Sequence, residues 1–142
     1  MKSKIEEKAL KFCLENKHRY TDPRRNVLKI ISESKQPLKA YEILEKLSLI
    51  MKNPKPPTAY RAIDFWRCYN FIHRIESLNA YAICEADHLH NGSQFMICDD
   101  CGEVTEAHFC EIPQIIKKDA KRKTFKPTRW NIEINGVCRK CS

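Results

Sequence analysis

The first half of the chain consists of amphipathic segments separated by breaks. In residues 2–19, apolar positions recur at helical spacing with Lys and Glu on the opposite side, which predicts a helix. A second helix is predicted to begin near Thr21, whose hydroxyl can cap its first turn, and a third is expected over about residues 39–51. Residues 54–57 form a proline-rich break, after which Thr58 is expected to cap a fourth helix.

Two short β-prone runs follow the fourth helix. Residues 71–76 and 80–84 are separated by the polar turn 77–79, so they are predicted to form a hairpin. Helices followed by a hairpin give the element order of a winged helix-turn-helix, in which the last helix enters the major groove of DNA. Because other small helical bundles share this order, the order alone leaves a plain helical domain open.

Most of the cysteines lie in the second half, and four of them form two matched pairs. Two residues separate Cys98 from Cys101, and two residues separate Cys138 from Cys141. Such pairs supply four thiolates, which is the ligand set of a tetrahedral structural zinc site. The alternatives are two unrelated thiol pairs or a thioredoxin-type redox motif, and the equal spacing of the two pairs favours zinc.

The segment between the cysteine pairs has its own pattern of elements. Residues 104–107 and 129–135 are strand-like, and residues 110–123 are helix-like. The two pairs are therefore expected at neighbouring strand ends of a small sheet crossed by one helix. The whole pattern predicts an α+β fold, with residues 1–83 as a winged-helix domain and residues 84–142 as a small α/β domain with a four-cysteine zinc site.

The charge of the chain is concentrated in its first half. Residues 1–83 contain 17 Lys/Arg and 9 Asp/Glu, whereas residues 84–142 contain 9 of each, so the first half carries the whole net charge of +8. A basic half beside a cysteine-rich half favours one part that contacts a polyanion and one part that holds metal. The alternative is a basic surface that only contacts solvent.

Composition disfavours several other classes of protein. The sequence contains no apolar run of about 18 residues that would span a membrane, and its start does not resemble a secretory signal. A cytoplasmic location is therefore expected, where cysteines serve metal or redox chemistry more often than disulfides. With only three glycines, the chain has no Gly-rich phosphate loop, and no small-molecule substrate is expected.

A second set of metal-ligand residue types is more dispersed along the chain. His73 lies in the predicted hairpin, Cys84 at its end, His88 and His90 in the following loop, and Glu106 after the first cysteine pair. Mixed nitrogen, sulfur and oxygen ligands near the junction of the two halves suit a reversible site, and a thiolate favours zinc over magnesium or calcium. Singly, His73 is also explained as a surface strand residue and Glu106 as a solvated charge.

Four segments resemble the ferric uptake regulator family, in the order in which that family has them. They are residues 55–65, 71–77, 94–102 and 136–141, and the resemblance extends over nearly the whole chain. The branch that looks most similar is the zinc uptake regulator. The resemblance implies a homodimeric, metal-sensing bacterial repressor with an N-terminal winged helix that binds DNA and a C-terminal α/β dimerisation domain.

The resemblance also implies roles for individual residues and two Zn²⁺ ions per chain. The structural zinc would be held by the matched cysteine pairs, Cys98, Cys101, Cys138 and Cys141. The regulatory zinc would be held by His73, Cys84, Glu106 and one loop histidine, either His88 or His90, of which His90 is nearer the usual offset. Contacts to DNA are implied for one residue of the third helix and three of the recognition helix, namely Tyr41, Thr58, Tyr60 and Arg61.

The function expected from these features is zinc-dependent repression of zinc uptake genes through a palindromic operator. An iron or peroxide sensor of the same family is the alternative, and Cys84 disfavours it because those sensors generally use nitrogen and oxygen ligands at this place. A zinc enzyme is disfavoured because the chain has no His-Glu-x-x-His motif. A four-thiolate site also has no open position for water, so no enzymatic activity is expected.

Overall fold

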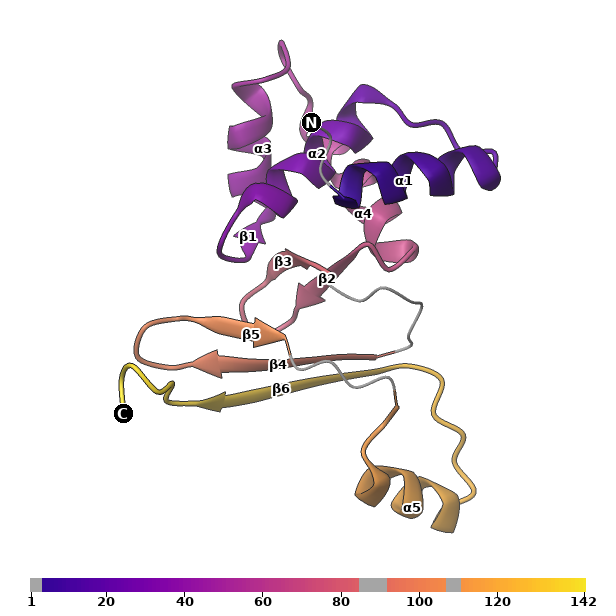
Figure 1. The fold of residues 1–142 in the computed structure, drawn as a ribbon, viewed down its shortest axis with the longest axis vertical. Helices are drawn as coiled ribbons and strands as arrows, with labels where there is room; N and C mark the ends of the chain where they lie inside the picture. Colours follow the sequence, from indigo (N-terminus) through magenta and orange to yellow (C-terminus); the bar gives the residue numbers. More distant parts are fainter. Residues whose placement is uncertain (1–3, 85–91, 107–110) are drawn as a thin grey trace. The chain divides into compact units, whose positions relative to one another are not determined.

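The computed structural model describes residues 4–84, 92–106 and 111–142, and it has the expected α+β composition. The chain forms two compact units, Met1–Cys84 and Glu85–Ser142 (Figure 1). None of the described helices is long and apolar enough to cross a membrane.

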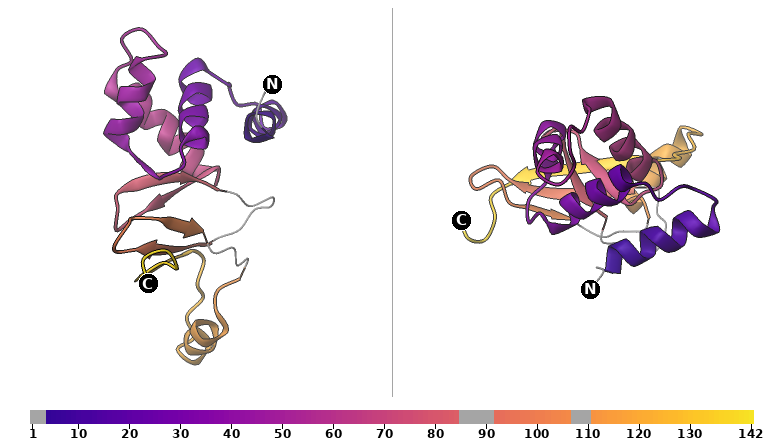
Figure 2. Two further views of the ribbon diagram at one scale, coloured as in Figure 1. Left: turned by 60° about the vertical axis from the view of Figure 1, so that its left-hand side comes forward. Right: turned by 90° about the horizontal axis from the view of Figure 1, so that it is seen from above.

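The first unit combines four helices with a three-stranded sheet (Figures 1 and 2). Its helices are α1 (Lys4–Glu15), α2 (Asp22–Glu33), α3 (Ala40–Ser48) and α4 (Pro56–Cys68). Its strands are β1 (Leu38–Lys39), β2 (Ile72–Ile75) and β3 (Ala80–Ile83), in the order β1-β3-β2. This is the element order of a winged helix, with the predicted hairpin formed by β2 and β3.

The starts of two helices test the capping signals in the sequence. Thr21 caps α2 as expected, with its hydroxyl oxygen accepting a hydrogen bond from the Arg24 amide at 3.4 Å. For α4 the expectation was wrong, because Lys55 is the N-cap and Thr58 lies inside the first turn. Prolines at 56 and 57 explain the earlier start, since proline is tolerated in the first turn, where amide groups lack helical partners.

The hairpin depends on asparagines that adopt left-handed backbone conformations. Asn70, after α4, has a φ of 61°, and Asn79, in the turn before β3, has a φ of 49°. Asparagine tolerates this region better than most residues with a side chain. The pairing of β2 with β3 is antiparallel and places His73 opposite Ala82. Strand β1 adds to β3, and its two residues are too few to show a period in the sequence.

The core of the first unit lies between α2, α3, α4 and the sheet. Trp66 is fully buried, and its indole Nε1 donates a hydrogen bond to the Arg24 carbonyl oxygen at 2.7 Å. Fully burying each large apolar side chain contributes about 1.5–3 kcal/mol. The buried faces of these three helices carry Val27, Leu28, Ile30, Ile31, Ile43, Leu47, Ala59, Ala62 and Ile63. The opposite faces of the helices therefore remain available to solvent.

The second unit contains a three-stranded sheet and one helix. The strands are β4 (Gly92–Cys98), β5 (Val104–Glu106) and β6 (Trp130–Gly136), in the order β5-β4-β6. Strand β4 is antiparallel to β5 and parallel to β6, and its Cys98 is opposite Gly136. At the other end of this ladder, Gly92 is opposite Trp130, whose indole occupies the space that a Cβ at Gly92 would need.

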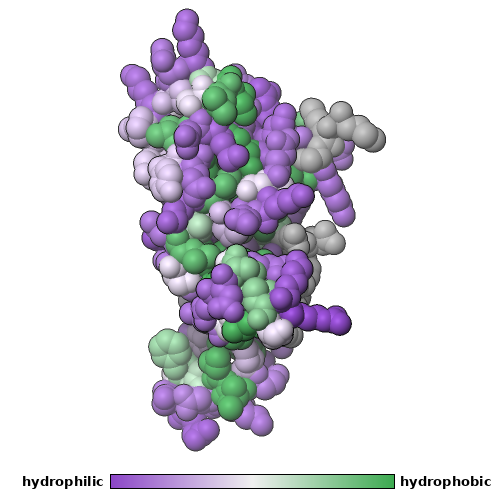
Figure 3. All heavy atoms as spheres, turned by 90° about the vertical axis from the view of Figure 1, so that its left-hand side faces the viewer, coloured by the Kyte–Doolittle hydropathy of each residue, from purple (hydrophilic) through white to green (hydrophobic). Residues whose placement is uncertain are grey.

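Helix α5 (Gln114–Arg122) joins β5 to β6 but does not cover the sheet (Figures 1 and 2). None of its residues is buried, which differs from the expected helix packed across the strands. The helix begins after Pro113, within the predicted range, and the first residue of that range lies outside the described residues. Apolar side chains remain exposed in this unit, among them Met96, Ile115, Phe125, Ile134 and Val137. Figure 3 shows green, hydrophobic groups at the surface of the molecule.

Candidate metal centre and nucleic-acid interface

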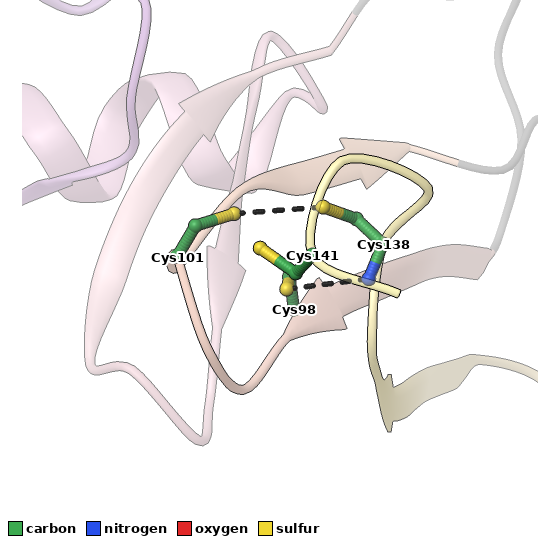
Figure 4. A group of neighbouring side chains, drawn as sticks. All are labelled: Cys98, Cys101, Cys138 and Cys141. Atoms are coloured by element: carbon green, nitrogen blue, oxygen red, sulfur yellow. Dashed lines mark hydrogen bonds between the residues drawn. The ribbon is translucent and has the colours of Figure 1, made fainter.

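The two cysteine pairs converge at one end of the second sheet. Parallel strands β4 and β6 end on the same side, so the segments that follow them are neighbours. Cys98 is the last residue of β4, Cys101 lies in the turn that follows, and Cys138 and Cys141 follow β6. In this four-cysteine cluster the sulfur atoms lie within 4.8 Å of one another (Figure 4). The expectation that the pairs meet at neighbouring strand ends is confirmed.

The separations within this cluster fit a tetrahedral zinc ion. Zinc–sulfur bonds of about 2.3 Å place the sulfurs of a tetrahedral site about 3.8 Å apart. Cys101 Sγ lies 3.7 Å from Cys138 Sγ. Cys98 Sγ also accepts a hydrogen bond from the Cys138 amide at 3.3 Å, which stabilises a thiolate more than a thiol. The residues present therefore suit a structural tetrathiolate zinc site, with no position left for a water ligand.

The thiols of the cluster differ in acidity because they form different hydrogen bonds. Backbone hydrogen bonds from Cys101 and then Cys138 lower the pKa of Cys98 to about 6. Hydrogen bonds from the side chains of Cys138 and then Cys101 raise the pKa of Cys141 to about 12. In this folded arrangement Cys98 forms a thiolate readily whereas Cys141 keeps its proton, so metal binding must release protons.

Backbone hydrogen bonds hold each cysteine pair in a tight turn. The Gly102 amide donates to the Cys98 carbonyl at 3.0 Å, and the Cys141 amide donates to the Cys138 carbonyl at 3.0 Å. Gly102 has a φ of 76°, in the left-handed region that glycine adopts at low cost. The Asp99 amide donates to the Gly136 carbonyl at 2.8 Å, which connects the two turns. The cluster is thus organised by the backbone as well as by the sulfurs.

Two residues of the second predicted ligand set are neighbours in the first unit. His73 on β2 and Cys84 directly after β3 are both buried, and their ligand atoms lie within 4.8 Å of one another. The Cys84 amide donates to the Phe71 carbonyl at 2.9 Å, which extends the hairpin pairing to this cysteine. His73 is therefore not a surface strand residue, and the pair suits a metal that accepts nitrogen and sulfur ligands.

The other residues predicted to bind the regulatory zinc do not belong to the described part of the first unit. Glu106 is the half-buried last residue of β5 in the second unit. His88 and His90 lie outside the described residues. The four-ligand regulatory site therefore remains a prediction that rests on the sequence and on the buried pair of His73 and Cys84.

The residues predicted to contact DNA lie on the solvent side of α3 and α4. Tyr60 is 51% exposed and Arg61 is exposed, whereas the neighbouring Ala59 is buried in the core. Tyr41, in the first turn of α3, is 64% exposed, and Thr58 is half-buried. Large aromatic and cationic groups thus project from the helix that a winged helix places in the major groove.

Sequence reasoning missed one group of cationic residues. Lys17, Arg19 and Arg24 border a cavity together with Arg61, which comes much later in the chain. The basic stretch just before and within the start of α2 was the only signal in the sequence. Whether these residues lie beside Arg61 depends on the packing of α2 against α4, which the pattern of apolar residues does not specify.

The fold and the cysteines define a winged-helix protein with a four-cysteine cluster suited to a metal ion. A model of the ferric uptake regulator family matches residues 15–135. The chain is also 34% identical to the zinc uptake regulation protein of Escherichia coli (strain K12) over 134 residues, which cover 94% of this chain and 78% of that protein. The chain therefore belongs to the ferric uptake regulator family.

Solved structures agree with this assignment over almost the full chain. A zinc uptake regulator complexed with zinc and DNA has a TM-score of 0.86 and 34% sequence identity, and the match covers 99% of this chain and 96% of that one. The crystal structure of holo XcZur has a TM-score of 0.83 and 33% identity, with coverage of 96% and 95%. The fold predicted from the sequence is thus confirmed.

Proposed function

We propose that this protein is a zinc-responsive transcriptional repressor that binds a palindromic operator as a metal-loaded homodimer and controls zinc uptake genes. The observation that carries the proposal is a four-cysteine cluster of tetrahedral dimensions in a chain that also has a winged helix. The similarity to zinc uptake regulators, one of them complexed with zinc and DNA, supports the same function. No catalytic residues are proposed.

The structural zinc would stabilise the second unit. Within the described part of this unit, the buried apolar side chains are Phe95, Ile97 and Cys98, which make a small core. A bound metal offsets a small core because its binding free energy becomes folding free energy. The exposed apolar side chains of α5 and β6 suit burial against a second copy, in agreement with the proposed homodimer.

The regulatory zinc would be the second ion of each chain. We propose His73 and Cys84 as two of its ligands, with Glu106 and one of His88 and His90 as the others. One thiolate and one carboxylate would neutralise the charge of Zn²⁺. Because Cys84 is buried beside His73, a Cys84 thiolate would be unfavourable there without a bound cation. Single alanine variants of the two histidines would identify the loop ligand by zinc stoichiometry.

Ligands from both units would couple metal binding to DNA binding. A filled site would restrict the separation of the two units, and so favour dimers whose recognition helices reach successive major grooves. The coupling is reciprocal, since operator DNA must increase zinc affinity by the same factor by which zinc increases operator affinity. In this arrangement Tyr41, Thr58, Tyr60 and Arg61 would contact DNA.

Metal analysis and operator binding together test the proposed function. Protein purified without chelators is expected to contain two zinc ions per chain, one with four sulfur ligands and one with mixed ligands, as read by X-ray absorption. Removal of only the weaker ion should abolish operator binding, and zinc should restore it at lower concentration than Fe²⁺. Operator binding that persists in the one-zinc form would contradict zinc-responsive repression.

A further inference from the structure

The second unit has an apolar cavity next to the four-cysteine cluster. Its volume is about 270 Å³. Met96 on β4 lies opposite both Thr105 on β5 and Ile134 on β6, so these three side chains share one face of the sheet. This face and the segment after β6 line the cavity, through Met96, Cys98, Thr105, Ile134, Val137 and Cys138 among others. Two cysteines of the cluster therefore form part of its wall.

The described residues of the unit leave this cavity open to solvent. Met96, Ile134 and Val137 are all exposed, although each is a large apolar side chain. Because an apolar cavity of about 150 Å³ holds one benzene molecule, this larger one has room for an aromatic side chain. An exposed apolar hollow of this kind marks an interaction site.

Phe125 is an exposed aromatic side chain at the end of α5. Its amide donates a hydrogen bond to the Ala120 carbonyl at 2.8 Å, which closes the helix. Thr124, just before it, has a φ of 53°, an unfavourable conformation for a β-branched residue. Such a conformation persists only where the surrounding structure requires it. The Phe125 side chain is nevertheless 67% exposed, so a single copy does not bury the ring that this turn presents.

Helix α5 and the cavity lie toward opposite ends of β6. The segment after α5 leads into the start of β6 at Trp130, whereas the cavity begins at Ile134 and continues to the cluster (Figure 1). Strand β6 is an edge strand of the described sheet. If two copies meet at this edge about a two-fold axis perpendicular to the sheet, their β6 strands are antiparallel. The start of each β6 then faces the end of the other.

We propose that α5 of one copy packs on the sheet of a second copy, where Phe125 fills the cavity beside the four-cysteine cluster. The inference rests on the proposed function, because it requires the homodimer, and it names the contact that joins the dimer to the structural zinc site. Each cluster then has one wall from its own chain and one from the partner. Since the apolar surroundings of a metal site control solvent access, the cysteines are shielded only in the dimer.

Charge favours this arrangement over a dimer in which the two α5 helices contact each other. Residues 114–129 contain seven Lys/Arg and one Asp, so two such segments side by side repel. The rest of residues 84–142 contains two Lys/Arg and eight Asp/Glu. One of these acids, Glu103, lines the cavity and lies 3.7 Å from Lys140. The basic helix is therefore attracted to the sheet of a second copy.

A double-mutant cycle tests the contact in protein that retains the structural zinc after removal of the weaker ion. Phe125→Ala removes the ring, Ile134→Ala enlarges the cavity, and a third variant carries both changes. Both side chains are exposed in one copy, so each variant should fold, and thermal melts verify this. Leu14→Ala, at an exposed position of α1, is the matched control. Sedimentation gives the dimer dissociation constant, and a colorimetric indicator follows zinc release to excess chelator.

Phe125→Ala is expected to raise the dimer dissociation constant by about 10–100-fold for each of its two equivalent contacts, because a large apolar side chain is no longer buried. Phe125→Leu should restore much of this loss. The double variant should lose less than the product of the two single losses, since residues in contact are coupled. Wild-type zinc release should slow as protein concentration rises through the dissociation constant, and Phe125→Ala should release zinc faster at equal concentration. Leu14→Ala should behave as wild type.

Three results would overturn the proposal. The first is a wild-type dissociation constant for Phe125→Ala, and the second is a pair of single losses that simply multiply in the double variant. The third is zinc release from wild-type protein that does not depend on protein concentration while dimers form. Each of these leaves the proposed function intact, because the homodimer then forms through another surface. A wild-type protein that stays monomeric with both zinc ions bound would instead refute the proposed homodimer.

Discussion

Removing metal from the four-cysteine cluster is expected to unfold the second unit and leave the first folded. The described core of the second unit contains only Phe95 and Ile97 besides Cys98, and each large apolar side chain contributes about 1.5–3 kcal/mol when buried. Structural zinc contributes about 10–16 kcal/mol at neutral pH in small zinc domains, which is several times larger. The first unit has its own core around Trp66 and does not depend on the cluster.

Each unit contains one tryptophan, so fluorescence reports the two units separately. Trp66 is fully buried in the first unit, and Trp130 packs against Gly92 in the second. A strong chelator should shift the emission of wild-type protein to longer wavelength, whereas the Trp130→Phe variant, which retains only Trp66, should not respond. Cys138→Ser should show the shifted emission without chelator, and Cys68→Ser, an exposed cysteine outside the cluster, should behave as wild type.

The reasoning would be refuted by a chelator that removes all zinc while Trp130 emission and the melting curve stay unchanged. That result would show that the sheet of the second unit is stable through packing alone. The same outcome for Cys138→Ser would remove the structural role from the four-cysteine cluster, even if the cluster still binds metal.

Three further predictions concern the recognition helix, the second sheet and the thiols. Arg61→Ala should reduce discrimination between operator and random duplex by about 1–3 kcal/mol per half-site if its contact to a base is bidentate, as measured by competition binding. Gly92→Ala should destabilise the second unit by about 1–3 kcal/mol in denaturant titrations, because its Cβ would overlap the Trp130 indole, whereas Gly136→Ala, which meets nothing within 4 Å, should have little effect. Zinc requires deprotonated thiols, and in the folded cluster the pKa of Cys98 is lowered to about 6 whereas that of Cys141 is raised to about 12, so protons compete with zinc for the cluster as pH falls. Zinc release to a colorimetric indicator and the shift of Trp130 emission should therefore occur together at the same pH.

Local signals in the sequence predicted most of the elements, since each depends on a few adjacent residues. Thr21 caps α2 and Asn70 takes the left-handed conformation after α4, both through the chemistry of one side chain. The start of α4 was misplaced because two adjacent prolines outweighed the capping preference of Thr58. Strand β1 was missed because a two-residue strand exists only through its pairing with β3.

The candidate sites also differ in whether local sequence signals were enough to predict them. The four-cysteine cluster was predictable because its ligands have a fixed spacing and follow parallel strands that end together. The cationic cavity was not, because it depends on the approach of Lys17 and Arg19 to Arg61 through tertiary packing. Helix α5 has an apolar face that the rest of its unit does not bury, so its amphipathic pattern misled the expectation that it covers the sheet.

Zinc-dependent operator binding by Cys84→Ser, titrated at fixed protein concentration, tests the central claim most directly. Cys84 is buried beside His73 and is the residue that favours zinc over iron at the regulatory site. The account predicts a variant that stays folded and dimeric and keeps the structural zinc, but loses the zinc-dependent increase in operator affinity, while Cys68→Ser keeps it. Wild-type zinc dependence in Cys84→Ser would show that this thiolate is not a sensing ligand, and would contradict zinc-responsive repression through this site.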